Sequence, residues 1–166
     1  MKKTNLSENG SSALPDGRLF KIGIIAAEWN PEVTDAMLEG AHKTLLQCGV
    51  QEDNVTTVRV PGTFELTTAA DMMLASTPNL DAVICIGCVI QGETRHFEFI
   101  CQAVSQGLTN VALRHGRPVI FSVLTTDNMD QALARSGGEH GNKGVEGAHT
   151  ALKMCALQHS LQAPKK

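Results

Sequence analysis

The sequence VICIGCVIQGETRHFEFI, residues 83–100, contains the transition on which our fold assignment rests. Its first eight residues are apolar or glycine, six polar or glycine residues follow from Gln91 to His96, and apolar residues then return at helical spacing. A strand that is apolar on both faces is typical of the middle of a parallel sheet covered by helices on each side. The stretch therefore predicts a buried strand, a polar turn and a helix in direct succession.

The same alternation of strand and helix runs through most of the chain. We expect strands at 19–27, 54–60, 81–90 and 118–124, and helices at 33–49, 64–76, about 94–115, 128–136 and about 144–162. This spacing predicts a three-layer α/β/α sandwich with a central, mainly parallel four-stranded sheet, a flavodoxin-like arrangement with right-handed crossovers. Residues 1–18 are rich in Ser, Asn and Gly and are expected to form a flexible N-terminal arm, followed by a single domain over 19–162.

Composition excludes several classes of protein. A formal net charge of −3 gives no reason to expect binding to nucleic acid or to an anionic membrane. The longest apolar run, 82–90, is about half the length that spans a bilayer, and 1–18 lacks the apolar core of a secretory signal. Cys85 and Cys88 are spaced C-x₂-C but would face opposite sides of a strand, so we expect reduced thiols, no metal site and a cytoplasmic protein.

Ligands of open parallel sheets bind at the carboxyl ends of the strands, so the residues that follow each strand are the candidate site. Trp29 follows the first strand beside Asn30, and Phe64 follows the second between Thr63 and Glu65. Two aromatic rings beside polar groups can sandwich a flat heterocycle and hold a hydroxylated tail. The alternative is that both rings cap the hydrophobic core.

The turn after the third strand has the features of an anion site. Gly92, Glu93 and Thr94 lead into a helix whose free N–H groups attract a phosphate, although many such turns bind nothing. His96 lies in the first helical turn, and an ordinary histidine pKa of about 6.5 suits a general acid or base near neutrality. A histidine with a purely structural role on the surface or in the core is the alternative.

Two cations flank the glycine-rich segment near the C-terminus. Arg135 is the better phosphate ligand because its planar fork can bind two oxygens, and Lys143 lies nearby in sequence; a solvated side chain is the alternative for each. Because the cysteines lie in apolar runs and no nucleophile motif is present, the chemistry is expected to proceed without an activated side-chain nucleophile.

Four motifs together are similar to the 6,7-dimethyl-8-ribityllumazine synthase family. They are VPGTFEL (60–66), IGCVIQGETRHFEFIC (86–101), VIFSVLTTD (119–127) and GNKGVEGA (141–148), in the family's order, within a similarity that covers roughly 19–157. The resemblance implies a transferase that condenses 5-amino-6-(D-ribitylamino)uracil with 3,4-dihydroxy-2-butanone 4-phosphate, without metal or organic cofactor. It further implies a homo-oligomer of pentamers with the site between adjacent subunits.

The resemblance also assigns roles to individual residues. His96, Arg135 and Lys143 would be catalytic, with Phe121, Arg135 and Lys143 coming from the chain opposite Trp29 and His96. Positions expected to contact the ribitylaminouracil are Trp29, Thr63, Phe64, Glu65, Cys88, Val89, Ile90 and Phe121. Positions expected to contact the phosphate are Gly92, Glu93, Thr94 and Arg135. Trp29 stands where the family usually has Phe. The short 135–143 segment favours a sixty-subunit icosahedral shell of twelve pentamers.

Two other functions fit part of the pattern. A non-catalytic flavin- or nucleotide-binding module would explain the aromatics and the anion turn, but it would leave His96, Arg135 and Lys143 without a role. A shell protein with a decayed site is the second alternative, and the presence of Trp29, His96 and Arg135 speaks against it.

Overall fold

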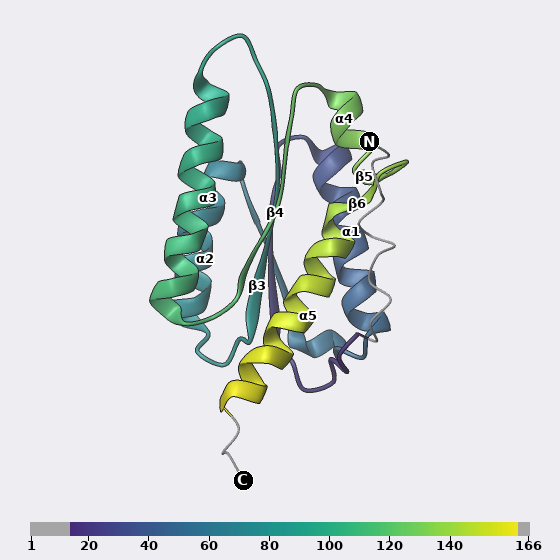
Figure 1. Cartoon of the computed structure of the whole chain (residues 1–166), viewed down its shortest axis with the longest axis vertical. Coiled ribbons are helices and arrows are strands. Elements are labelled where there is room, and N and C mark those ends of the chain that lie inside the picture. The colour runs from purple at the N-terminus through teal and green to yellow at the C-terminus, as the bar shows by residue number, and fades with distance from the viewer. Residues whose placement is uncertain (1–13, 163–166) are drawn as a thin grey trace.

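A computed structural model of the chain describes residues 14–162 and contains the predicted parallel sheet (Figure 1). The main sheet has four strands in the order β2-β1-β3-β4, all parallel, and thus confirms the predicted fold class. Its strands are β1 (Ile22–Ala27), β2 (Val55–Val60), β3 (Ala82–Ile90) and β4 (Val119–Thr126). The helices are α1 (Pro31–Gln47), α2 (Leu66–Ser76), α3 (His96–His115), α4 (Met129–Leu133) and α5 (Lys143–Gln162), with short 3₁₀ turns η1 (Glu52–Asn54) and η2 (Thr63–Glu65).

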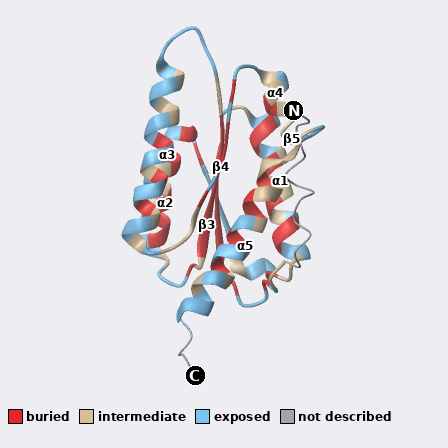
Figure 2. Cartoon of the chain, viewed as in Figure 1, coloured by how far each residue is buried: buried red, intermediate tan, exposed pale blue. Residues whose placement is uncertain are grey.

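Helices cover both faces of the sheet, with α2 and α3 on one side and α1, α4 and α5 on the other (Figure 1). Each face has its own apolar core, and β3 contributes to both because alternate residues point to opposite sides. Cys88 belongs to the α1–α5 core and Cys85 to the α2–α3 core, which confirms that the two thiols face apart. Buried residues accordingly concentrate in the strands and on the inner faces of the helices (Figure 2).

The strand order places a topological switch point between β1 and β3. From β1 the chain passes through α1 to β2 on one side, whereas β3 passes through α3 to β4 on the other. Loops leaving β1 and β3 therefore diverge at their carboxyl ends and leave room between them for a ligand. Residues 28–30 and 91–95 are those two loops.

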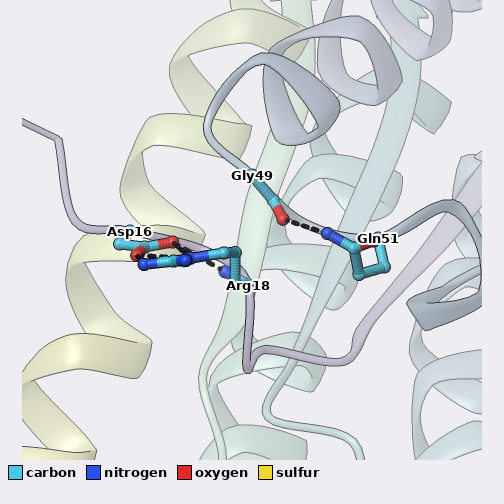
Figure 3. A network of polar contacts seen from close by, with 4 residues as sticks. All are labelled: Asp16, Arg18, Gly49 and Gln51. Atoms are coloured by element: carbon cyan, nitrogen blue, oxygen red, sulfur yellow. Dashed lines mark hydrogen bonds and ion pairs between the residues drawn. The ribbon is translucent and has the colours of Figure 1, made fainter.

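Most of the predicted arm lies outside the described residues, but its last part is placed. Gly17 donates its N–H to the Cys48 carbonyl at 2.8 Å, and a Cβ at position 17 would lie 2.6 Å from Val50. Asp16 and Arg18 form an ion pair beside the turn at Gly49, where Gln51 donates to the Gly49 carbonyl (Figure 3). Residues 14–18 are thus held against the end of α1, at the rim opposite the strand carboxyl ends.

Two predicted helix boundaries need correction. The helix expected from about Thr94 begins at His96, and the helix expected over 128–136 ends at Leu133. Arg135 therefore lies beyond α4, because the chain turns at Ala134 into a strand. The glycine-rich segment forms a small antiparallel hairpin of β5 (Ser136–Gly138) and β6 (Gly141–Asn142), where no strand was predicted.

Within residues 14–162, none of the helices combines the length and the apolar character that crossing a bilayer requires.

The packing of α5 against α1 at Gly144 leads to a stability prediction. A Cβ at Gly144, at the start of α5, would lie 1.8 Å from the Met37 carbonyl oxygen of α1. Alanine is the better helix former, so any loss of stability in Gly144→Ala must come from this collision. We expect the substitution to lower the free energy of unfolding by about 2–3 kcal/mol, measured by chemical denaturation. Gly92→Ala, where the added Cβ meets nothing within 4 Å, is the control. Equal unfolding midpoints for Gly144→Ala and the unsubstituted protein would contradict the prediction.

Candidate active site

The carbonyl of Cys88, near the end of β3, joins the loops that follow three strands. It accepts a hydrogen bond from Asn30 Nδ2 at 3.1 Å and another from Thr63 Oγ1 at 3.3 Å. Asn30 follows β1 and Thr63 follows β2, so both neighbouring loops are fixed to the central strand. Thr63 is buried and its hydroxyl is engaged inside the protein, so its side chain is held by the fold in the single chain.

Asn30, predicted only as a polar neighbour of Trp29, also has an unusual backbone conformation. Its φ of 58° and ψ of 54° make it the one residue other than glycine with positive φ among residues 14–162. Asparagine tolerates this conformation better than most residues, and such strained positions cluster at functional sites. An Asn between a buried strand and the Pro31 that begins a helix was the signal in the sequence.

The two aromatic residues of the predicted sandwich are exposed in the single chain. Trp29 is 64% exposed and Phe64 is 53% exposed, so the alternative of two rings capping the core does not fit. Trp29 packs on Gly62, where a Cβ would lie 2.6 Å from the indole ring. Glu65 accepts the Gly62 N–H through Oε2 at 3.1 Å, which fixes the turn beneath the indole. Both rings are therefore exposed in the loops that follow β1 and β2.

The turn after β3 is exposed throughout, from Gln91 to His96. Gln91 donates its N–H to the Thr126 carbonyl at 2.8 Å, and Thr94 Oγ1 accepts the N–H of His96 at 3.4 Å. Because α3 begins at His96, the positive end of the helix dipole lies at His96, two residues beyond its expected place. Gly92, Glu93 and Thr94 precede that helix end as an exposed loop.

The remaining predicted contacts on β3 are partly covered. Val89 and Ile90 are half-buried, and Cys88 is buried. Burial raises the pKa of the Cys88 thiol to about 11 and that of Cys155 to about 12, and it also raises the pKa of Cys85. These thiols stay protonated at neutral pH and are therefore poor nucleophiles.

Of the other three predicted residues, Phe121 lies on the edge strand β4, Lys143 begins α5, and Arg135 lies between α4 and the β5–β6 hairpin. Phe121 is 41% exposed on β4, and it lines a groove of about 720 Å³ together with Lys143 at the start of α5. The groove crosses the β4 edge between α3 and α5, and its exposed apolar side chains are Leu113, Met154, Leu157 and Leu161. Its lining, within residues 14–162, includes none of Trp29, Phe64 and His96.

Arg135 and Lys143 are joined through the backbone. The N–H of Lys143 donates to the Arg135 carbonyl at 2.9 Å across the β5–β6 hairpin. The Arg135 guanidinium donates to the Gln131 carbonyl at 2.9 Å, whereas Lys143 Nζ pairs with Glu146 at 2.5 Å. Because Lys143 already has a carboxylate partner, Arg135 is the stronger candidate for binding an anion.

The predicted site residues thus fall into two groups. The strand-end group is Trp29, Thr63, Phe64, Glu65, Cys88, Val89, Ile90, Gly92, Glu93, Thr94 and His96. The β4 group is Phe121, Arg135 and Lys143. Polar contacts of the first group run between the loops after β1, β2 and β3, and those of the second run to α4, α5 and the hairpin. Across the part of the chain that the structure describes, His, Cys, Asp and Glu side chains form no group of three or more that could hold a metal ion.

Known proteins are similar to this chain over nearly its whole length. A family model described as 6,7-dimethyl-8-ribityllumazine synthase matches residues 19–159. A protein of that name from Cytophaga hutchinsonii is 56% identical over 146 residues, 88% of this chain and 91% of the relative. Another of that name, from Porphyromonas gingivalis, is 51% identical over 154 residues, 93% of this chain and 95% of the relative. A third, from Parabacteroides distasonis, is 50% identical and covers 90% of this chain and 93% of the relative.

The buried thiols generate a labelling prediction. When the pKa of a thiol is raised, less thiolate is present at pH 7, so Cys85, Cys88 and Cys155 should react very slowly with iodoacetamide. The half-buried Cys48 and Cys101 should react first, as read by mass spectrometry of peptides. Protein unfolded in guanidinium, in which all five should react, is the control. Labelling of Cys88 at the unfolded rate in native protein would show that its thiolate is accessible.

Proposed function

The chain belongs to the 6,7-dimethyl-8-ribityllumazine synthase family, and we propose that each of its active sites is formed by two adjacent copies. The reaction condenses 5-amino-6-(D-ribitylamino)uracil with 3,4-dihydroxy-2-butanone 4-phosphate to give 6,7-dimethyl-8-ribityllumazine, phosphate and water. One copy supplies the strand-end group and its neighbour supplies the β4 group.

The strand-end group suits the flat pyrimidine and its ribityl chain. Trp29 and Phe64 offer exposed aromatic faces on which a pyrimidine ring can stack. Glu65 and the backbone of Thr63 lie beside them and can hydrogen-bond to hydroxyl groups. The ends of Cys88, Val89 and Ile90 form the floor, and Phe121 of the neighbouring copy closes the pocket.

The chemistry requires alignment and proton transfer more than a protein nucleophile. The amine of the uracil attacks the ketone carbonyl and loses water to form an imine. Phosphate then leaves by elimination to give an enol, which tautomerises to a methyl ketone. The ribityl-bearing nitrogen attacks that carbonyl and closes the second ring with loss of a second water. Alignment of two bound reactants contributes several kcal/mol to such a reaction. His96, exposed at the start of α3, is positioned to move protons during imine formation and elimination.

The phosphate of the second substrate is bound from both copies. The positive end of α3 and the preceding turn, Gly92 to Thr94, come from one copy. Arg135 of the neighbour supplies a charge-assisted contact, and Lys143 with its Glu146 partner lies beside it. Binding in this way stabilises the charge that develops as phosphate leaves.

The proposal of a shared site is supported by the apolar groove at the β4 edge, whose described lining includes Phe121 and Lys143 but none of Trp29, Phe64 and His96. Exposed Leu113, Leu157 and Leu161 around the β4 edge form an apolar surface of the kind that marks a protein interface. A neighbouring copy seated there would bring its strand-end group to Phe121 and Lys143. We propose that five copies form a closed pentamer and that twelve pentamers form a sixty-subunit shell. We further propose that this assembly acts in the cytoplasm.

Removing Arg135 tests both the activity and the phosphate site. We expect Arg135→Ala to lose a contact of about 1.5–3 kcal/mol, a fall of about 10- to 200-fold in kcat/KM for the butanone phosphate. The measurement is the rate of lumazine formation above the spontaneous rate. Arg18→Ala removes an exposed arginine at the opposite rim and should have no effect. No catalysis by the unsubstituted protein would favour a non-catalytic binding module instead.

Mixing defective chains tests whether two copies share the site. As pure assemblies, His96→Ala should be nearly inactive and Arg135→Ala should keep at most about a tenth of the kcat/KM for the butanone phosphate. Random co-assembly at equal ratio should restore about a quarter of the sites, since one interface in four pairs two intact groups. Trp29→Ala mixed with His96→Ala is the control, because both changes lie in the strand-end group and no intact site can form. No recovery in either mixture would show that the site lies within one chain, and equal recovery in both would show that Trp29 and His96 do not come from the same copy.

A further inference from the structure

Asn142, at the end of β6, forms four hydrogen bonds through one side-chain amide. Its Nδ2 donates to the Ala36 carbonyl of α1 at 3.0 Å and to the Ser136 carbonyl of β5 at 3.2 Å. Its Oδ1 accepts the N–H groups of Gly144 at 2.8 Å and Val145 at 3.3 Å. An amide has two donors and two acceptor positions, so these contacts use its full capacity. Asn142 therefore caps α5 and fixes the hairpin to α1 at once.

Asn142 lies next to both cations of the β4 group, in sequence or across the hairpin. Asn142 directly precedes Lys143 and pairs with Ser136, the residue after Arg135, in the β5–β6 hairpin. The N–H of Lys143 meets the Arg135 carbonyl at 2.9 Å, and the Lys143 carbonyl accepts Ser122 Oγ at 3.0 Å. The Asn142 amide thus contacts Ser136 and Gly144, the residues that follow the two cations, and it links this segment to α1 through Ala36.

Close packing leaves this amide little freedom. A Cβ added at Gly40 of α1 would lie 2.7 Å from Asn142 Nδ2 and 2.9 Å from its Cγ. Such a position requires the amide to shift, since contacts below 3.0 Å are sterically excluded. The Asn142 side chain therefore fits against α1 because residue 40 has no Cβ. A methyl group at position 40 would displace the Asn142 amide without changing its chemistry.

We propose that Asn142 is a positioning residue that sets the separation of Arg135 and Lys143 for the phosphate of the substrate. The proposal rests on the proposed role of these two cations in phosphate binding. Small displacements of groups that bind or align a substrate reduce catalysis strongly, so a rigid attachment of the hairpin to α1 has a functional value beyond stability.

Two substitutions displace the attachment by different means. Asn142→Ser keeps a hydroxyl that can cap α5 but loses the donors to Ala36 and Ser136, whereas Gly40→Ala pushes the intact amide away. We expect both to raise the KM for the butanone phosphate and the inhibition constant of inorganic phosphate by about 3- to 10-fold, the effect of one lost hydrogen bond. The KM for the ribitylaminouracil should stay within about two-fold, because the strand-end group is untouched.

Controls separate positioning from stability and from failure of the proposed function. Val50→Ala removes buried volume at the opposite rim and should lower the unfolding midpoint without changing either KM. Equal increases in KM for both substrates, or KM changes in Val50→Ala of the same size, would overturn the positioning role. If Arg135→Ala raises the KM for the phosphate substrate but Asn142→Ser and Gly40→Ala do not, this inference alone fails. If Arg135→Ala also has no effect, the proposed phosphate site is itself wrong.

Discussion

The two hydrogen bonds accepted by the Cys88 carbonyl are the constraint on which the rim of the molecule depends. Parallel strands bring their carboxyl ends to one edge, but this alone leaves the loops beyond them free to take different directions. Asn30 and Thr63 attach two of those loops to the central strand. The indole of Trp29 and the ring of Phe64 acquire fixed places because the backbone beneath them is fixed.

Much of the architecture was predictable because strong local patterns agree with the final packing. The apolar stripe Val33, Met37, Ala41 and Leu45 is fully buried on α1, and the doubly buried β3 follows from its uninterrupted apolar run. The end of α4 and the β5–β6 hairpin were not predictable from periodicity. A five-residue helix is too short to show a period, and the hairpin is held by contacts such as that of Asn142 with α1, distant in sequence.

The sequence supports a prediction of the candidate site as a set of residues, which stays a prediction, and it contains no information on their arrangement. Loop chemistry after each strand identified the aromatic rings and the turn before α3, and their exposure in the structure agrees with a role in binding. Phe121 pairs with Cys85 in the sheet register, three residues before Cys88 near the end of β3, and Lys143 begins α5. No periodicity in a sequence encodes a neighbour's position. The apolar groove along β4 is the feature of the structure that supports a neighbouring copy at this edge.

The left-handed backbone of Asn30 limits how this position can vary. Glycine would adopt the same φ of 58° with ease, yet it would leave the Cys88 carbonyl with one partner fewer. Aspartate would fit the backbone as well, but its carboxylate has no donor and would face a carbonyl oxygen. Larger or β-branched side chains are strained in this conformation. Two independent features therefore restrict which residues can replace Asn30: the left-handed conformation of the main chain and the need for a side-chain donor such as Nδ2.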